Sequence, residues 1–202
     1  TKTYCLSRRK NNNNQKNIEE LIIDFEKLDD FDLPKIDHVY LCLGYELRAW
    51  ELIVMPDKLK KPFYKVDYEY TLNIAKKSLD AGAKSISLVS AVGANTDSTS
   101  FYLKTKGELE EEIKKLPFET INIFQPGHLA GRIDWQRKKS DPRIDVFAFE
   151  IASLFFDPFM ISGLRKFMSI NAKRLAKFII KKSKENHNGI NYMSYNDFTY
   201  DN

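Results

Sequence analysis

The residues of this sequence best suited to chemistry are Ser90, Tyr102 and Lys106. A tyrosine and a lysine at positions i and i+4 lie on one face of a helix, so the ammonium can activate the phenol and bind a ribose hydroxyl. Ser90 ends a strand-like run and can hold a substrate oxygen while Tyr102 donates a proton. This spacing also occurs by chance in solvated helices, but its position soon after a strand favours the functional interpretation.

A basic cluster follows the first strand-like run. Ser7, Arg8 and Arg9, with Lys10, stand where a dinucleotide-binding fold selects its cofactor. Arginines and a serine hydroxyl suit the 2′-phosphate of NADP, whereas an acidic residue would suit NAD. The cluster therefore predicts NADP. A solvated basic turn is an equally good interpretation.

The ends of the next strand-like runs carry weaker signals. Asp24 and Phe25 could contact an adenine ring, although a carboxylate in an acidic stretch is more often the start of a helix. Leu43 and Gly44 end the following run, where a small residue lets the backbone approach a cofactor. A tight turn would explain this glycine equally well.

Alternating strands and helices must position these residues. Strand-like runs lie at Thr3 to Leu6, Leu21 to Ile23, His38 to Leu43, Ser85 to Ser90 and Thr120 to Phe124. Apolar residues at helical spacing between Tyr68 and Leu79, and between Tyr102 and Leu116, predict helices with one face to bury. Strands separated by helices of this length form a parallel sheet, so the predicted fold class is α/β.

The two ends of the chain give further expectations. Ala172 to Ile180 has an amphipathic pattern that predicts a helix, capped by Ser169 and followed by a basic run. Four asparagines, Asn11 to Asn14, supply no apolar face and predict a surface loop.

Composition narrows the class of protein. With 202 residues, 43% hydrophobic, 30% charged and a net charge of +4, the chain is typical of one globular domain without an extended nucleic-acid-binding surface. Its most apolar region, from Ile144 to Leu164, is interrupted by acidic residues, so we expect no membrane span. Cys5 and Cys42 lack metal-ligand spacing and suit buried thiols in a reducing compartment. We therefore expect a cytoplasmic protein without a bound metal.

In order and separation, the motifs resemble the short-chain dehydrogenase/reductase superfamily, and more narrowly its atypical branch with the Tat-interacting oxidoreductase group. The resemblance covers about residues 3–192. It rests on Ser7–Lys10, Ile23–Asp30, Cys42–Gly44, Val66–Asp67, Leu88–Ser90 with Gly93–Ala94, Tyr102 with Lys106–Glu108, and Phe124–Gly127.

The resemblance implies a Rossmann-type, doubly wound parallel sheet that binds NADP. It implies one NAD(P)-binding domain over residues 1–202, with residues 129–168 and 185–202 as a substrate-side cap and tail. Ser90, Tyr102 and Lys106 become the catalytic trio. The resemblance also implies that one loop lies beside the nicotinamide, formed by Pro126, Gly127, His128 and Leu129. It further implies that Arg132 lies near the substrate entrance.

The sequence departs from the family in two places. The glycine-rich turn G-x-x-G-x-x-G is absent, and in the family it precedes the strand that begins here near Thr3. We therefore expect a truncated product that lacks the first strand and turn, which puts its cofactor binding in doubt. Leu47 to Pro62 replaces a short glycine-containing loop, and we expect its Trp50 to anchor the loop in the core.

These observations lead to two functional hypotheses. The first is an NADPH-dependent reductase of a small carbonyl compound, in which Tyr102 delivers the proton. The alternative is a non-catalytic NADP-binding sensor or interaction protein with a protein partner. The trio favours chemistry, whereas the missing turn and the altered loop favour binding alone. Nucleic-acid binding by the basic C-terminal helix is a weaker interpretation, since basic helix ends also complement the helix dipole.

Overall fold

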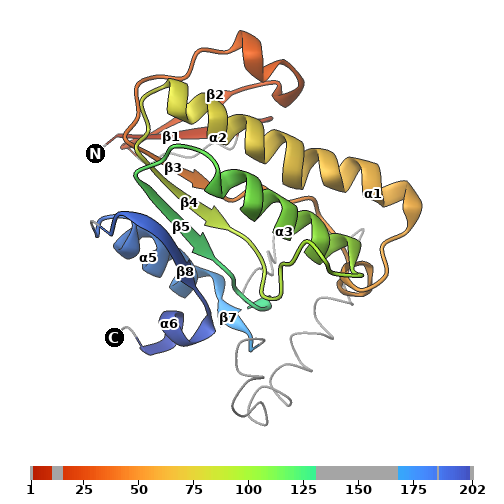
Figure 1. The fold of residues 1–202 in the computed structure, drawn as a ribbon. Coiled ribbons are helices and arrows are strands. Elements are labelled where there is room, and N and C mark those ends of the chain that lie inside the picture. Colours follow the sequence, from red (N-terminus) through yellow and green to blue (C-terminus); the bar gives the residue numbers. More distant parts are fainter. Residues whose placement is uncertain (1, 11–15, 131–167, 186, 201–202) are drawn as a thin grey trace.

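The computed structural model describes residues 2–10, 16–130, 168–185 and 187–200 (Figure 1). Strands and helices alternate along this part of the chain, and every strand pairing in it is parallel. The longer strands are β1 (Thr3–Ser7), β2 (Ile18–Ile22), β3 (His38–Leu41), β4 (Ser85–Val89), β5 (Thr120–Phe124) and β8 (Gly189–Met193). The predicted α/β class with a parallel sheet is confirmed.

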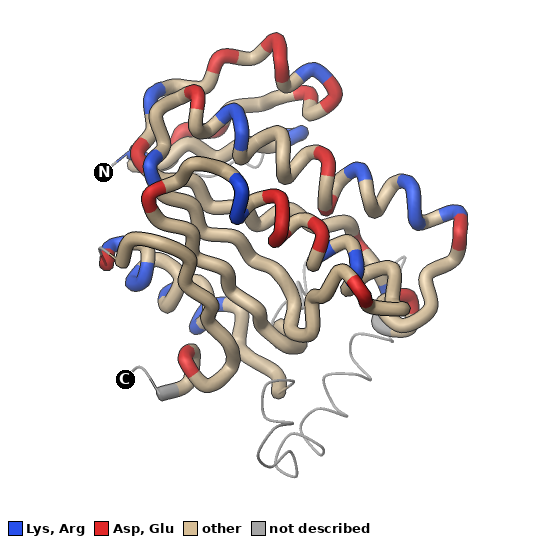
Figure 2. Tube along the Cα trace, viewed as in Figure 1, with Lys and Arg blue, Asp and Glu red and all other residues tan. Residues whose placement is uncertain are grey.

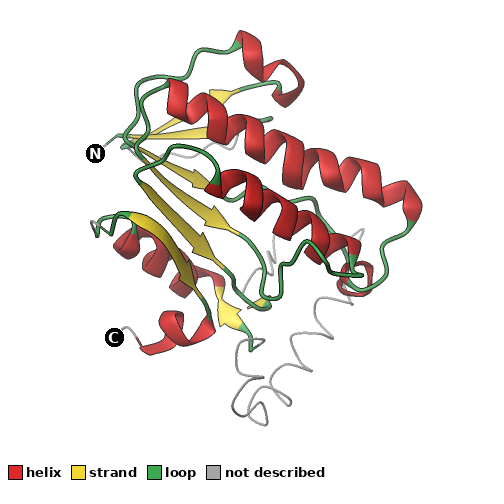
Figure 3. Cartoon of the chain, viewed as in Figure 1, coloured by secondary structure: helices red, strands yellow, loops and turns green. Residues whose placement is uncertain are grey.

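The strands form two main sheets. One has four strands in the order β3-β4-β5-β8, and β1 pairs with β2 in the other. Leu6 of β1 and Leu21 of β2 pack against the same apolar cluster as Val39 and Leu41 of β3, so both sheets share one core. Figure 3 shows the strands of both sheets pointing to the same side of the molecule. The segments that follow these strands therefore lie along one side.

Two helical stretches cover one face of the four-stranded sheet (Figure 1). They are α1 (Asp57–Tyr64), continued by η3 (Lys65–Tyr70) and α2 (Thr71–Asp80), and α3 (Phe101–Lys114). Leu72 and Ala75 of α2 and Ile113 of α3 supply the apolar faces that pack on the sheet. After α2 the chain turns at Gly82, whose φ of +95° lies in the left-handed region that favours glycine.

The other face of the sheet packs against α5 (Ala172–Lys182) and α6 (Tyr195–Tyr200). Strand β5 is buried throughout because its side chains alternate between the two faces of the sheet and helices cover both faces. Ile121 and Ile123 join the α2–α3 side, and Phe124 joins the α5–α6 side. The short elements are η1 (Phe25–Asp30), η2 (Ala49–Leu52), β6 (Leu129–Ala130) and β7 (Ile170–Asn171).

Helix α3 lies unusually close to the loop that follows β4. A Cβ at Gly107 would stand 2.5 Å from the carbonyl carbon of Asn95 and 2.6 Å from the nitrogen of Thr96. The hydroxyl of Ser100 caps the start of α3 by accepting a hydrogen bond from the Leu103 N–H. Glycine at position 107 therefore sets how closely α3 approaches the segment that carries Ser90.

Several details differ from the sequence-based expectations. Part of the expected tail, residues 185–202, forms β8, which pairs with β5 at the sheet edge although only its Met193 is buried. Asn171, not Ser169, caps α5, because its side-chain oxygen lies within reach of the first-turn N–H groups. Trp50 is 51% exposed and does not anchor its loop in the core, because η2 lies at the surface. The predicted loop at Asn11 to Asn14 lies outside the described residues. None of the described helices is long and apolar enough to cross a membrane.

Candidate active site

Lys106 is held by a buried ion pair. Its side chain is 6% exposed, and its ammonium lies 2.7 Å from Oδ1 of Asp67, whose side chain is 3% exposed. Burial lowers the pKa of Lys106, but the charge of Asp67, with Tyr102 and Glu110 nearby, outweighs burial and raises that pKa above its usual value. Lys106 is therefore a cation at neutral pH.

A local irregularity in the helix positions Asp67. Lys65–Tyr70 form a turn of π-helix between α1 and α2, a feature that is frequent at functional sites. Oδ2 of Asp67 accepts a hydrogen bond of 2.6 Å from the backbone N–H of Tyr45. Asp67 thus joins α3, through Lys106, to the turn that follows β3.

Ser90 is bound to a buried carboxyl group. It follows β4, and its backbone N–H donates a hydrogen bond of 2.8 Å to the carbonyl of Phe124 on β5. Its hydroxyl donates to Oε1 of Glu110 on α3. The side-chain amide of Gln125 donates to both Glu110 oxygens, at 3.0 and 3.1 Å. Burial raises the pKa of Glu110 above its ordinary value, although the hydrogen bonds from Gln125 and Ser90 oppose this shift.

Tyr102, Lys106 and Glu110 follow one another at four-residue spacing on α3 and therefore share one face of that helix. The ring of Tyr102 packs against Phe63 of α1, with ring centroids 5.6 Å apart. The fold thus brings the phenol, the ammonium and the carboxyl group that binds Ser90 onto one row. In such a row Tyr102 can carry a proton while the hydroxyl of Ser90 is held close by, as general acid catalysis requires.

The basic cluster after β1 is exposed. The hydroxyl of Ser7 donates a hydrogen bond of 2.8 Å to the carbonyl of Arg9 and so closes the turn. Arg8 and Arg9 are exposed, and neither forms an ion pair with any residue that the structure describes. Both guanidinium groups are therefore accessible to an anion. A solvated basic turn without a ligand would have the same geometry.

Asp24 and Phe25 already have local partners. Oδ1 of Asp24 accepts a hydrogen bond of 3.0 Å from the Glu26 N–H and caps η1, as the helix-start interpretation predicts. Phe25 stacks on Tyr70, with ring centroids 5.5 Å apart. Both residues follow β2 in the sequence.

The loop after β5 is tied to its neighbours by backbone hydrogen bonds. The carbonyl of Pro126 accepts one from the Val92 N–H at 3.0 Å, and that of His128 accepts one from the Ile170 N–H at 2.8 Å. This loop contains the residues predicted to lie beside the nicotinamide: Pro126, Gly127, His128 and Leu129. Leu43 and Gly44 follow β3. Arg132 lies outside the described residues.

Comparisons with known proteins find relatives and a shared fold, although no family model matches the chain. The protein HTATIP2 of Rattus norvegicus is 32% identical over 115 residues, 56% of this chain and 44% of that protein. Protein fmp52, mitochondrial, of Emericella nidulans is 41% identical over 91 residues, 45% of this chain and 37% of that protein. A Burkholderia cenocepacia short-chain dehydrogenase in complex with NADP matches with a TM-score of 0.58 at 14% identity, covering 95% of this chain and 76% of that one.

The chain is related to the first two proteins and has the Rossmann fold of the third. The expected likeness to the group of the protein HTATIP2 is confirmed by the first match, and the expected Rossmann fold by the third. The chain spans less than half the length of the two curated relatives. Because fmp52 is named a mitochondrial protein, the expected cytoplasmic location is wrong. Cys5 and Cys42 are free and exposed, so they are not the buried thiols that the sequence suggested, and free cysteines do not identify the compartment.

Sequence reasoning missed the roles of Asp67, Glu110 and Gln125. Asp67 appeared only within a family motif, and Gln125 only as part of the segment after β5. Glu110 had one usable signal, because it continues the four-residue spacing of Tyr102 and Lys106 along α3. Nothing in the sequence alone pairs it with Ser90.

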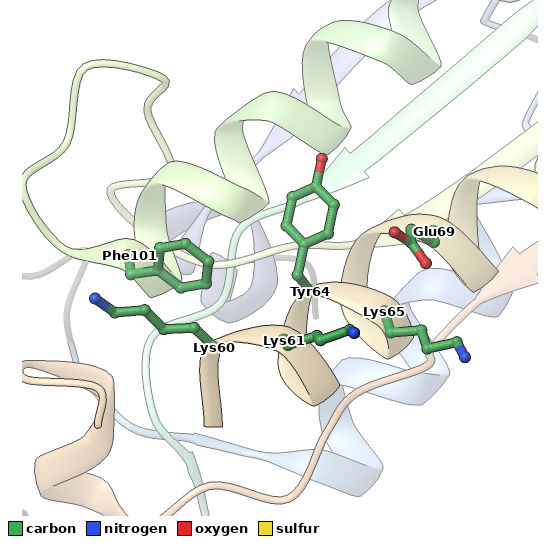
Figure 4. Close-up of a pocket in the computed structure, with 6 residues that line it drawn as sticks. All are labelled: Lys60, Lys61, Tyr64, Lys65, Glu69 and Phe101. Atoms are coloured by element: carbon green, nitrogen blue, oxygen red, sulfur yellow. The ribbon is translucent and has the colours of Figure 1, made fainter. Parts of the chain in front are cut away.

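A shallow pocket of about 340 Å³ lies between the α1–η3 segment and the start of α3 (Figure 4). Its lining residues are Lys60, Lys61, Tyr64, Lys65, Glu69 and Phe101. Two of its lysines already have acidic partners, since Lys60 pairs with Asp57 and Lys65 with Glu26. None of the predicted site residues lines it, so we do not assign it to the candidate active site.

Proposed function

We propose that the chain forms part of an NADP-dependent reductase that acts on a small carbonyl compound. The observation that carries the proposal is the buried pair of Lys106 and Asp67, one helical turn from Tyr102. Keeping a charged lysine inside a protein costs free energy unless a partner compensates it. A cation held in this way beside a phenol supports acid–base chemistry.

The arrangement of the described residues supports a dinucleotide site. The segments after β1, β2, β3 and β5 lie along one side of the molecule, which is where open parallel sheets bind ligands. Arg8 and Arg9 would hold the 2′-phosphate of NADP, and Lys106 would bind a ribose hydroxyl. When bound, the nicotinamide supplies the hydride. The preference for NADP over NAD rests on the two arginines.

The protein's own residues would handle the proton. Ser90 would hold the carbonyl oxygen of the substrate, and Tyr102 would donate its phenolic proton to that oxygen as negative charge develops there. The ammonium of Lys106 would stabilise the phenolate that remains. Asp67 is a positioning residue, because it fixes the ammonium without touching the substrate.

One observation favours the alternative, an NADP-binding sensor without turnover that acts through a protein partner. The hydroxyl of Ser90 already donates its proton to Glu110. In that state the serine can offer only lone pairs to a ligand, and a carbonyl oxygen needs a donor. The reductase therefore requires this hydrogen bond to change when a substrate binds.

The experiment that separates the two functions compares Tyr102→Phe with the wild type. Oxidation of NADPH is followed by absorbance with a panel of small aldehydes, ketones and quinones, and NADPH affinity is titrated by fluorescence. Tyr102→Phe keeps the ring against Phe63 but removes the proton, so NADPH should still bind while turnover falls at least a hundredfold, roughly the contribution of a general acid. Tyr195→Phe on α6 is the matched control and should leave turnover unchanged.

Two results would contradict the reductase. If Tyr102→Phe turns over a panel substrate as fast as the wild type, the phenol is not the proton donor. If the wild type binds NADPH and reduces no member of the panel, the sensor explains the protein better.

A further inference from the structure

The exposed side of α5 carries a dense row of cations. Five basic side chains of the helix and the turn after it are exposed: Lys173, Arg174, Lys177, Lys181 and Lys184. At the 100° per residue of an α-helix they fall within an arc of about 100°. Leu175, Phe178 and Ile179 are buried on the opposite side, in the cluster that holds Phe124. The packing of α5 on the sheet therefore turns the whole basic row outward.

Most of this positive charge is not neutralised within the described part of the chain. Lys173, Lys177 and Lys184 form no ion pair there, and Arg174 donates a hydrogen bond of 2.7 Å to a backbone carbonyl, that of Thr199. Glu185 is the acidic residue at this end of the helix, and it pairs with Lys182 and His187. Figure 2 shows the basic positions along α5 with few acidic neighbours.

The helix dipole does not account for the row. Basic residues in the last turn complement the negative end of the dipole, which explains Lys181. Lys173 and Arg174 instead occupy the first turn, where the dipole is positive and cations are unfavourable. These two residues need an explanation outside the helix itself.

Apolar side chains lie beside the cations. Ile180 is 49% exposed on α5, and Tyr40 of β3 is 41% exposed. The hydroxyl of Tyr40 is 2.6 Å from that of Ser183 at the end of α5, so this ring adjoins the C-terminal part of the row. We call the five cations, Ile180 and Tyr40 the α5 face.

We propose that the α5 face docks the protein onto a membrane surface that contains anionic lipids. Clustered lysines on an amphipathic helix are attracted to such a surface, by roughly fivefold in partitioning per cation. An isoleucine and a tyrosine among them suit the boundary between headgroups and acyl chains. A duplex presents charged phosphates at its surface and would leave Ile180 without an apolar partner, so a nucleic acid fits the face less well. The proposal does not depend on the reductase activity.

Vesicle sedimentation tests the proposal with the full 202-residue chain. Phosphatidylcholine vesicles with and without a third of phosphatidylserine are compared at low and high salt. We expect the wild type to bind only the anionic vesicles, and high salt to weaken that binding because it screens the charges. Lys173→Glu/Lys177→Glu should weaken the binding at least tenfold. Ile180→Ser should weaken mainly the component of vesicle binding that persists at high salt.

Lys58→Glu/Lys61→Glu on α1 is the matched control. Both lysines are exposed and the change in net charge is the same, so binding should stay within about twofold of the wild type. Equal thermal melts show that each variant is folded. The proposal is wrong if the wild type does not bind anionic vesicles, or if both double variants lose binding equally. It is also wrong if a short DNA or RNA duplex displaces the protein from the vesicles and this competition is lost in Lys173→Glu/Lys177→Glu.

Discussion

The hydroxyl of Ser90 donates a hydrogen bond to Glu110, and this bond joins the end of β4 to a buried carboxyl group on α3. While Glu110 is ionised, the proton of the serine points at it. Once Glu110 is protonated, it can donate to Ser90 and release the serine hydroxyl toward a ligand. The proton on Glu110 therefore decides whether Ser90 can donate.

The first prediction concerns stability against pH at Glu110. Burial raises its pKa in the folded chain above the unfolded value, so the folded state prefers the neutral carboxyl. Its stabilising contribution is complete below the unfolded pKa and is lost as the pH rises through the folded pKa. In urea titrations from pH 4 to 8, Glu110→Gln should remove this loss. The prediction fails if both proteins lose stability in parallel over that range.

The second prediction concerns the buried pair of Asp67 and Lys106. Asp67→Ala leaves an uncompensated ammonium in the interior and should lower the free energy of unfolding by about 3 to 5 kcal/mol. Asp67→Ala/Lys106→Met removes both charges and should recover most of that loss. Chemical denaturation measures both values. A double variant less stable than Asp67→Ala would show that the ion pair is not the source of the effect.

The third prediction concerns Gly107. Alanine is ordinarily favoured over glycine in a helix by about 1 kcal/mol, so helix propensity alone predicts stabilisation by Gly107→Ala. The new Cβ would instead meet the backbone of Asn95 and Thr96, which cannot rotate away as a side chain can. We expect a loss of about 1 to 3 kcal/mol. Gly44→Ala is the control, since its nearest atom would be 3.9 Å away. Similar melting temperatures for the two variants would refute the steric argument.

The fourth prediction concerns cofactor choice. A charge-assisted contact is worth about 1.5 to 3 kcal/mol, so Arg8→Ala should weaken NADPH about tenfold or more and leave NADH nearly unchanged. Lys27→Ala, a similarly exposed cation on η1, is the control and should change neither affinity. Fluorescence titration with both nucleotides provides the measurement. Equal weakening of NADPH and NADH would mean that Arg8 does not read the 2′-phosphate.

Sequence reasoning was most successful where local pattern and structure agree. The spacing of Tyr102 and Lys106 placed both residues on one helix, because an α-helix repeats every 3.6 residues whatever its surroundings. The apolar runs at β4 and β5 identified buried strands, because strands of a parallel sheet that is covered on both faces are apolar at successive positions. Pattern could not find β8, because its side chains are mostly exposed and the strand is defined by backbone pairing with β5.

The sequence by itself determined the α/β class, the order of its main elements and the helix that carries Tyr102 and Lys106. Only the tertiary structure decided which partners those elements receive. Asp67 meets Lys106, and Glu110 meets Ser90, across different elements of the fold. Such contacts depend on the distance of approach between packed elements, which Gly107 helps to set and which no local periodicity encodes.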